Sequence, residues 1–270
     1  MNRKILAGTA ALCCGAMQAI ACTGISLTAK DGSYVQARTI EAAAGALKSE
    51  YVVIPRGQTI TSFTPSGING LEFTARYGVV GMSVVMKEFI CEGINEAGLS
   101  AGLFFFPHYG QYEPYDASLN NVSLGDLQVP TWILSQFATI DEVKEGIKNV
   151  RIVGLDAASV VHYRIGEPSG RQVVLEIVNG VPNFYENSVG VLTNSPGFQW
   201  HLTNLNNYVN QLPIAKWVTL RCRLLVEIRD SWDYRVTQLL HLDLCALHFI
   251  GPLLLNSPKR YQRFYNASIY

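Results

Sequence analysis

The sequence predicts an α+β domain in which strands come first, two helices follow and strands resume. Three observations support this fold class. Asp31 and Gly32 form a hairpin signal between two β-prone runs, Pro130 and Thr139 lie where two helical segments begin, and Gly180 belongs to a later turn between strand-like runs. With 270 residues, 49% of them hydrophobic and 16% charged, the chain can bury one large core.

The first part of the domain is expected to consist of strands. Residues 23–29 and 33–40 flank the Asp-Gly pair, whose positive φ suits a tight hairpin. Several later runs are apolar on both faces, which indicates a sheet that is covered on each side. These further strands are expected at 51–54, 77–86, 89–93 and 99–106.

The helices are expected after residue 128. Pro130 suits the first turn of a helix that continues to residue 137. Thr139 and Glu142 form a capping-box pattern before a run that reaches residue 147. Strands are expected to resume at 160–165, 172–178 and 189–193, with turns at 168–170 and 179–180.

The charge balance and the cysteine spacing exclude several functions. Equal counts of 21 basic and 21 acidic residues, with no basic stripe, give no reason to expect a nucleic-acid partner. A small-molecule substrate fits this composition better. Beyond residue 21 the cysteines are Cys22, Cys91, Cys222 and Cys245, which form no C-x-x-C unit, so no metal or other cofactor is expected.

Residues 1–21 are predicted to be a secretory signal peptide. A basic start at 2–4 precedes an apolar run at 5–20, and residues 19–21 form an A-x-A cleavage site. The run is too short for a confident membrane span, and no later segment offers about twenty uninterrupted apolar residues. We therefore expect export to the periplasm or the cell exterior, without a membrane span. The alternative is that residues 1–21 form a core helix of a cytosolic protein.

Cleavage after Ala21 would leave Cys22 with both a thiol and a free α-amine. An amine with an ordinary pKa of about 8 can accept the thiol proton, so this one residue can supply both nucleophile and base. Arg38 is a candidate cation for stabilising the thiolate, because the hairpin folds its strand back beside Cys22. Glu41 follows three residues later and could orient the amine.

Four stretches of the sequence together resemble the choloylglycine hydrolases. They are Cys-Thr-Gly at 22–24, Ala-Arg-Thr at 37–39 with its nearby acid, "EGINEAGL" at 92–99 followed by "AGL", and "VGVLTNSPGFQWHLTNLNNYV" at 189–209. This family comprises bile salt hydrolases and penicillin V acylases, which hydrolyse linear amides and share a four-layer αββα N-terminal-nucleophile fold. The resemblance covers about residues 22–210 and implies this fold, with possible assembly into a homotetramer.

The resemblance also implies roles for individual residues. Cys22 would be the nucleophile and amine base, Arg38 its electrostatic partner, and Asn194 would lie in or beside the oxyanion hole. Two positions depart from the family pattern: Glu41 stands where many members have aspartate, and Phe104 stands where Gram-positive members have asparagine. Phe104 can donate only its main-chain N–H, as in the Gram-negative branch.

The implied reaction is acyl transfer through a thioester, on conjugated bile salts or alternatively on penicillin V. Apolar side chains after the Gly-Leu pair are candidate walls for a steroid or phenoxyacetyl group, although ordinary core positions would have the same composition. These candidates are Phe104, Phe105, Phe106 and Tyr109.

The residues after 210 do not contain the glycine-rich motif that follows in the family, whose first arginine lines the active site. Gly251 is the single glycine after residue 200. Read from the third base of each codon, Trp232 and Asp233 must together give a glycine, and neighbouring codons permit the missing motif. We therefore expect that the reading frame was lost between about residues 211 and 220, which the nucleotide sequence can test.

This hypothesis divides the chain into a signal peptide at 1–21, a hydrolase domain at 22–213 and an out-of-frame tail at 214–270. The C-terminal part of the αββα sandwich would then be incomplete. Alternatives are a diverged tail with a helix at 217–228, an inactive relative of the family, and a lipoprotein acylated at Cys22. The lipoprotein alternative lacks the usual larger aliphatic residue three positions before the cysteine.

Overall fold

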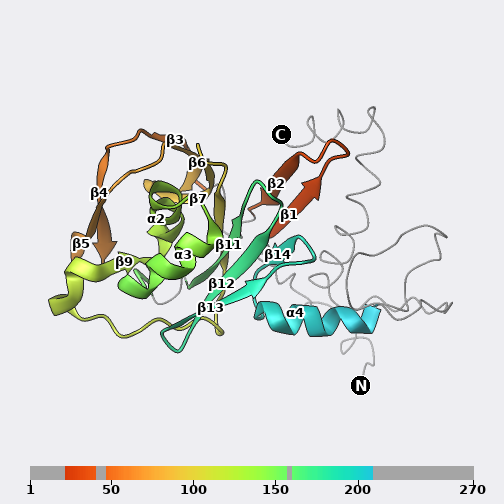
Figure 1. Cartoon of the computed structure of the whole chain (residues 1–270). Coiled ribbons are helices and arrows are strands. Elements are labelled where there is room, and N and C mark those ends of the chain that lie inside the picture. The colour runs from red at the N-terminus through yellow and green to blue at the C-terminus, as the bar shows by residue number, and fades with distance from the viewer. Residues whose placement is uncertain (1–21, 41–46, 157–159, 209–270) are drawn as a thin grey trace, which may run out of the picture.

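The structure is a computed structural model that describes residues 22–40, 47–156 and 160–208 (Figure 1). Its centre is an antiparallel seven-stranded sheet with the order β13-β12-β11-β8-β7-β6-β3. Its strands are β3 (Tyr51–Ile54), β6 (Val79–Val84), β7 (Met86–Asn95), β8 (Ser100–Phe105), β11 (Val161–Gly166), β12 (Gln172–Val178) and β13 (Val181–Glu186).

Two helices pack against one face of this sheet: α2 (Val129–Gln136) and α3 (Ile140–Gly146). Helix α3 begins as expected, because the Thr139 hydroxyl accepts a hydrogen bond from the Glu142 amide at 3.2 Å. Asn95 ties β7 to α2, since its Nδ2 donates to the carbonyl of Leu134 at 2.9 Å. This face holds the larger hydrophobic core.

A three-stranded sheet packs on the opposite face, with the order β14-β1-β2. It consists of β1 (Thr23–Thr28), β2 (Tyr34–Thr39) and β14 (Val191–Thr193), and helix α4 (Phe198–Leu205) follows β14. A second buried cluster lies between the two sheets and α4, formed by Cys22, Phe104, Val174, Val189, Leu192 and Phe198. The described residues therefore form a helical layer on two layers of sheet.

The face of the seven-stranded sheet that meets the small sheet is its inner face. In the part of the chain that the structure describes, this face is covered over β8, β11 and β12 but open over β3, β6 and the Ile94 end of β7. Val53, Val80 and Ile94 are cross-strand partners in one row. Their exposed fractions are 69%, 53% and 50%. The expected sheet with two covered faces is thus confirmed for its central strands, whereas this row lies exposed.

The expected elements agree closely with the structure where turn signals were strong. Residues 51–54 and 172–178 are strands with the expected bounds, and both helices lie where capping signals placed them. The turn at 179–180 has the expected positive φ values, 52° at Asn179 and 75° at Gly180.

Several elements were not expected from the sequence. They are the hairpin of β4 (Thr59–Thr64) and β5 (Gly67–Thr74), the parallel pair β9 (Ser123–Gly125) and β10 (Arg151–Val153), strand β13, helix α4, and the 3-10 turns η1 (Ala117–Val122), η2 (Asp126–Gln128), η3 (Ile147–Asn149) and η4 (Asn206–Tyr208).

No helix within the described ranges is long and apolar enough to span a membrane.

Candidate active site

Cys22 lies at the start of β1, between the ends of two neighbouring strands. Thr23 pairs with Thr39 of β2 on one side and with Thr193 of β14 on the other. Continuing both antiparallel registers by one residue places Cys22 opposite Ile40 and Asn194. Cys22 is 7% exposed and packs in the cluster between the two sheets. The fold thus brings together Cys22 and Asn194, which are far apart in the sequence.

Gly24 allows β1 to approach the central sheet closely. A Cβ atom at this position would lie 2.5 Å from the Phe104 ring and 2.6 Å from Nη1 of Arg164. Both side chains are buried, so neither can move away cheaply. A glycine is therefore required at position 24 for steric reasons. Its close approach to the central sheet also sets how deeply the preceding Cys22 is buried.

We expect Gly24→Ala to destabilise the protein by about 1–3 kcal/mol, because overpacking at this site must displace Phe104 or Arg164. Chemical denaturation would measure this loss. Gly78→Ala is the matched control, since its nearest neighbour would be Glu96 at 3.6 Å, an ordinary contact. Equal stabilities of the two variants would contradict the assigned role of Gly24.

Arg38 lies on the inner face of β2, where it is the register partner of Gly24. Its side chain is 4% exposed. Its Nη1 donates to the carbonyl oxygens of Cys91, at 3.0 Å, and of Leu103. The guanidinium carbon lies 4.3 Å from the centre of the Phe104 ring, close enough for a cation–π interaction. Arg38 is therefore held rigidly beneath the hairpin.

A second arginine that sequence reasoning missed joins this cluster. Arg164 of β11 is fully buried, and its Nη2 lies 2.8 Å from Oε1 of Glu92. Glu92 also lies 3.9 Å from Arg38, so two cations share one carboxylate. The excess positive charge favours an anion close to this cluster. The sequence signal for Arg164 is an arginine inside the strand-like run VHYRIG at 161–166, all of which is buried in the structure.

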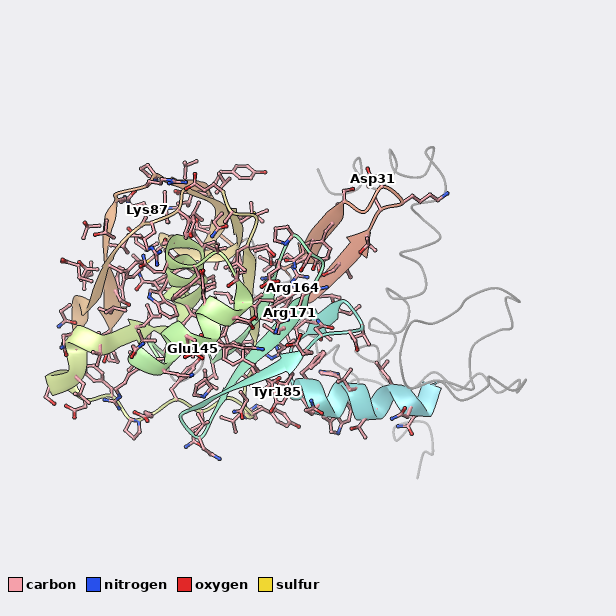
Figure 2. The ribbon with its side chains drawn as sticks, viewed as in Figure 1. Asp31, Lys87, Glu145, Arg164, Arg171 and Tyr185 are labelled. Atoms are coloured by element: carbon pink, nitrogen blue, oxygen red, sulfur yellow. The ribbon has the colours of Figure 1, made fainter. Side chains whose placement is uncertain are left out.

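Arg164 also connects the two sheets. Its Nη1 donates to the carbonyl of Ile25 in β1 at 3.1 Å. Figure 2 shows Arg164 near the base of the β1–β2 hairpin, with Asp31 at the hairpin's outer tip. The same side chain thus pairs with Glu92 and holds β1, the strand that directly follows Cys22.

Cys91 is a second buried thiol near the candidate nucleophile. Burial raises the pKa of Cys91 to about 11, while the nearby Arg38 opposes this shift and Glu92 and Cys22 add to it. Its Sγ donates to the carbonyl of Met82 at 3.1 Å. Cys91 is consequently a neutral thiol at neutral pH.

We expect iodoacetamide at neutral pH to alkylate Cys22 and to leave Cys91 unmodified, because the thiolate is the reactive form and Cys91 lacks it. Peptide mass spectrometry after a time course would measure both rates. Modification of Cys91 should become faster as the pH rises toward 11. Faster labelling of Cys91 than of Cys22 at neutral pH would contradict this assignment.

Asn194 follows β14 and is 5% exposed. Its Oδ1 accepts a hydrogen bond from the Phe105 amide at 3.1 Å. This contact identifies Oδ1 as the acceptor end of the side-chain amide. The NH2 group, Nδ2, is therefore its donor end. The main-chain carbonyl oxygen of Asn194 lies 3.1 Å from Nε2 of His201 in α4. The strand register thus places Asn194 at the position opposite Cys22.

A buried hydrogen-bonding network that was not expected from the sequence contacts the residues on either side of Asn194. His162 is fully buried, with its Nδ1 at 3.2 Å from Oε1 of Glu176 and its Nε2 at 2.9 Å from the carbonyl of Thr193. Glu176 also accepts from the amide of Phe198 at 2.7 Å. This network links β11, β12, β14 and the start of α4.

The structure divides the four candidate wall residues. Phe104 and Phe106 are fully buried, and Phe106 stacks on the His162 ring with centroids 4.3 Å apart. Phe105 is partly buried, and Tyr109 is 50% exposed. A role as substrate walls stays a prediction.

Two other expectations concern residues that the structure does not describe. Glu41 lies outside the described residues, as do residues 209–270, so the expectations for both remain predictions. Within the described ranges, no group of three or more histidine, cysteine, aspartate or glutamate side chains is arranged to hold a metal ion.

Comparison with known proteins identifies related sequences. The chain is 32% identical over 211 residues to the bile salt hydrolase/transferase of Clostridium perfringens, covering 72% of this chain and 61% of that protein. It is 30% identical over 203 residues to the conjugated bile acid hydrolase of Lactobacillus acidophilus, covering 71% and 61%. The chain thus spans about three fifths of the length of these curated relatives.

Solved structures of similar fold agree with the sequence matches. A variant of the conjugated bile acid hydrolase from Clostridium perfringens has a TM-score of 0.65 at 26% identity, covering 88% of this chain and 74% of that chain. Penicillin V acylase from Agrobacterium tumefaciens has a TM-score of 0.60 at 24% identity, covering 71% and 57%, a likeness that concerns the fold.

The family itself matches over most of the chain. Residues 22–220 match the family described as linear amide C-N hydrolases, choloylglycine hydrolase family, and the match begins at Cys22. The layers of helix and sheet fit the N-terminal-nucleophile fold of the solved relatives. The chain therefore belongs to the choloylglycine hydrolase family of linear amide C–N hydrolases.

Proposed function

We propose that this protein hydrolyses linear amides through Cys22 after removal of residues 1–21, with conjugated bile salts as the substrates. One observation carries the proposal: β1 places Cys22 opposite Asn194, with Arg38 on the same inner face. The family match that begins at Cys22 supports a mature chain that starts there. Export to the periplasm or the cell exterior is part of the proposal.

Two solved relatives support the roles of the cysteine and the arginine. Both are variants of the bile acid hydrolase from Clostridium perfringens, one with an arginine replaced and the other with a cysteine replaced. The replaced positions are separated by the same number of residues as Cys22 and Arg38. The pair in this chain also shares the buried face of the small sheet.

In the first step of the proposed mechanism, the α-amine of Cys22 accepts the thiol proton and the thiolate attacks the amide carbonyl. The carbonyl oxygen becomes an oxyanion, to which Nδ2 of Asn194 donates. The C–N bond then breaks, and the leaving amine takes the proton from the α-ammonium group. The product of this step is a thioester on Cys22.

In the second step, water attacks the thioester carbonyl and passes a proton to the α-amine. The carbon–sulfur bond breaks, and the thiolate regains its proton from the ammonium group. The product forms as a carboxylic acid, which gives its remaining proton to solvent and leaves as the carboxylate. Arg38 and Arg164 stabilise the anionic species, since the two arginines share the single carboxylate of Glu92.

The substrate class is tested with a panel of amides. The full chain, expressed with its signal peptide in a Gram-negative host and purified from the periplasm, should release glycine from glycocholate and taurine from taurocholate. Penicillin V provides the competing substrate. Release from the bile salts at a higher kcat/KM than from penicillin V is expected, whereas a preference for penicillin V would reverse the assignment. Absence of both activities would contradict the proposed function of this chain.

A further inference from the structure

We propose that His162 and Glu176 are positioning residues that hold Asn194 in place for the oxyanion. This inference rests on the proposed function, because it assigns Asn194 a donor role that the reaction requires. His162 and Glu176 are buried side chains that support the site without touching the substrate. Their role is to fix the backbone on both sides of Asn194.

The first contact lies immediately before Asn194. Nε2 of His162 is 2.9 Å from the carbonyl oxygen of Thr193. A carbonyl oxygen can only accept, so Nε2 must carry a proton and donate it. This bond fixes the peptide plane that joins Thr193 to Asn194. Any rotation of that plane would swing the Asn194 side chain away from its place opposite Cys22.

The second contact lies a few residues after Asn194. Oε1 of Glu176 accepts from the amide of Phe198, the first residue of α4, at 2.7 Å. The carboxylate thus anchors the start of the helix, where amide groups lack partners within the helix. Because His162 and Glu176 are themselves 3.2 Å apart, one connected unit holds both ends of the segment 194–197.

One proton must be shared between Nδ1 of His162 and Oε1 of Glu176. With Nε2 already donating to Thr193, an unprotonated Nδ1 facing a carboxylate would bring two acceptors together at 3.2 Å. An imidazolium with a carboxylate and a neutral imidazole with a carboxylic acid both satisfy the contact. In either form the donor toward Thr193 is retained.

The surroundings of the pair keep it rigid. His162 is fully buried and Glu176 is 3% exposed, so water does not compete for their contacts. The ring of Phe106 stacks on His162 at 4.3 Å with an interplanar angle of 6°, and Phe104 meets it edge-on at 6.3 Å. These rings fix the imidazole plane, so its donor points at Thr193.

The test compares three variants for hydrolysis of a bile salt and for alkylation of Cys22 by iodoacetamide. Alkylation needs the thiolate but forms no oxyanion, so it isolates the nucleophile from the oxyanion site. His162→Gln keeps an amide donor near Nε2. His162→Leu combined with Glu176→Gln removes that donor without leaving an unpaired buried carboxylate, and this double variant also limits the risk of misfolding.

Gln128→Leu is the matched control for stability. Gln128 is fully buried and its Oε1 accepts from the hydroxyl of Ser62 at 2.9 Å, in the β4–β9 region and outside the Cys22 cluster. Its loss should lower the melting temperature while leaving kcat of the folded protein within about threefold of wild type.

The double variant is expected to lose about 10–100-fold in kcat, with KM and the alkylation rate within about threefold of wild type. His162→Gln should recover most of this loss. Equal losses in alkylation and hydrolysis, or a double variant with wild-type kcat, would overturn the proposal. If the wild type itself does not hydrolyse the substrate, the proposed function fails, but crystal structures of wild type and double variant still decide this inference. An Asn194 side chain in the same position in both would refute it.

Discussion

Replacing Cys22 by alanine is expected to reduce the hydrolysis of bile salts by at least about 10³-fold, because the variant retains an N-terminal amine but has no nucleophile. The residue is small and belongs to the apolar cluster between the sheets, so the fold should tolerate alanine at this position. Purified variant and wild type would be compared at saturating substrate, with melting temperatures measured alongside.

Cys91→Ala is the matched control for this variant. Cys91 is also a buried thiol, and burial keeps it protonated at neutral pH. Its removal should lower stability by a modest amount and leave kcat within about threefold. If Cys91→Ala instead abolished hydrolysis and Cys22→Ala left it intact, the assignment of the nucleophile would be wrong.

Replacing Asn194 by leucine is expected to lower kcat by about 10²–10³-fold with a small change in KM, because the side-chain donor stabilises charge that develops only in the transition state. The shape of the residue is nearly kept, but Nδ2 is lost and the Phe105 amide loses its acceptor. Steady-state kinetics with a bile salt would measure both parameters.

Asn187→Leu controls for the loss of a buried asparagine near β14. Asn187 is 6% exposed, and its Nδ2 donates to the carbonyl of Val191 at 3.2 Å. This variant should have a lower melting temperature and a nearly unchanged kcat. A loss of kcat in Asn187→Leu as large as in Asn194→Leu would show that the effect comes from misplacing β14 and not from the donor.

The sequence predicts those parts of the fold that depend on local signals. The Asp31–Gly32 turn, the proline at the start of α2 and the cap at Thr139 each act within a few residues, and each lies where it was expected. The hairpin β4–β5 was missed because its runs are rich in polar residues and glycine and show no clear alternation.

The site was predicted in part. The family motifs identify Cys22, Arg38 and Asn194 as candidates, and in the structure these residues lie around the start of β1. The contact between Glu92 and Arg164 joins strands β7 and β11, and no local pattern specifies such a pair. The His162 and Glu176 pair was missed for the same reason, since it depends on how β11 and β12 pair.

Intact-mass and peptide mass spectrometry can show whether Cys22 becomes an N-terminal nucleophile. The protein would be purified from its own host and treated with a thiol-directed acylating substrate analogue. We expect a chain that begins at an otherwise unmodified Cys22 and carries the acyl group on its sulfur. A retained signal peptide, a lipid-modified Cys22, or an N-terminal cysteine that the analogue does not label would contradict it.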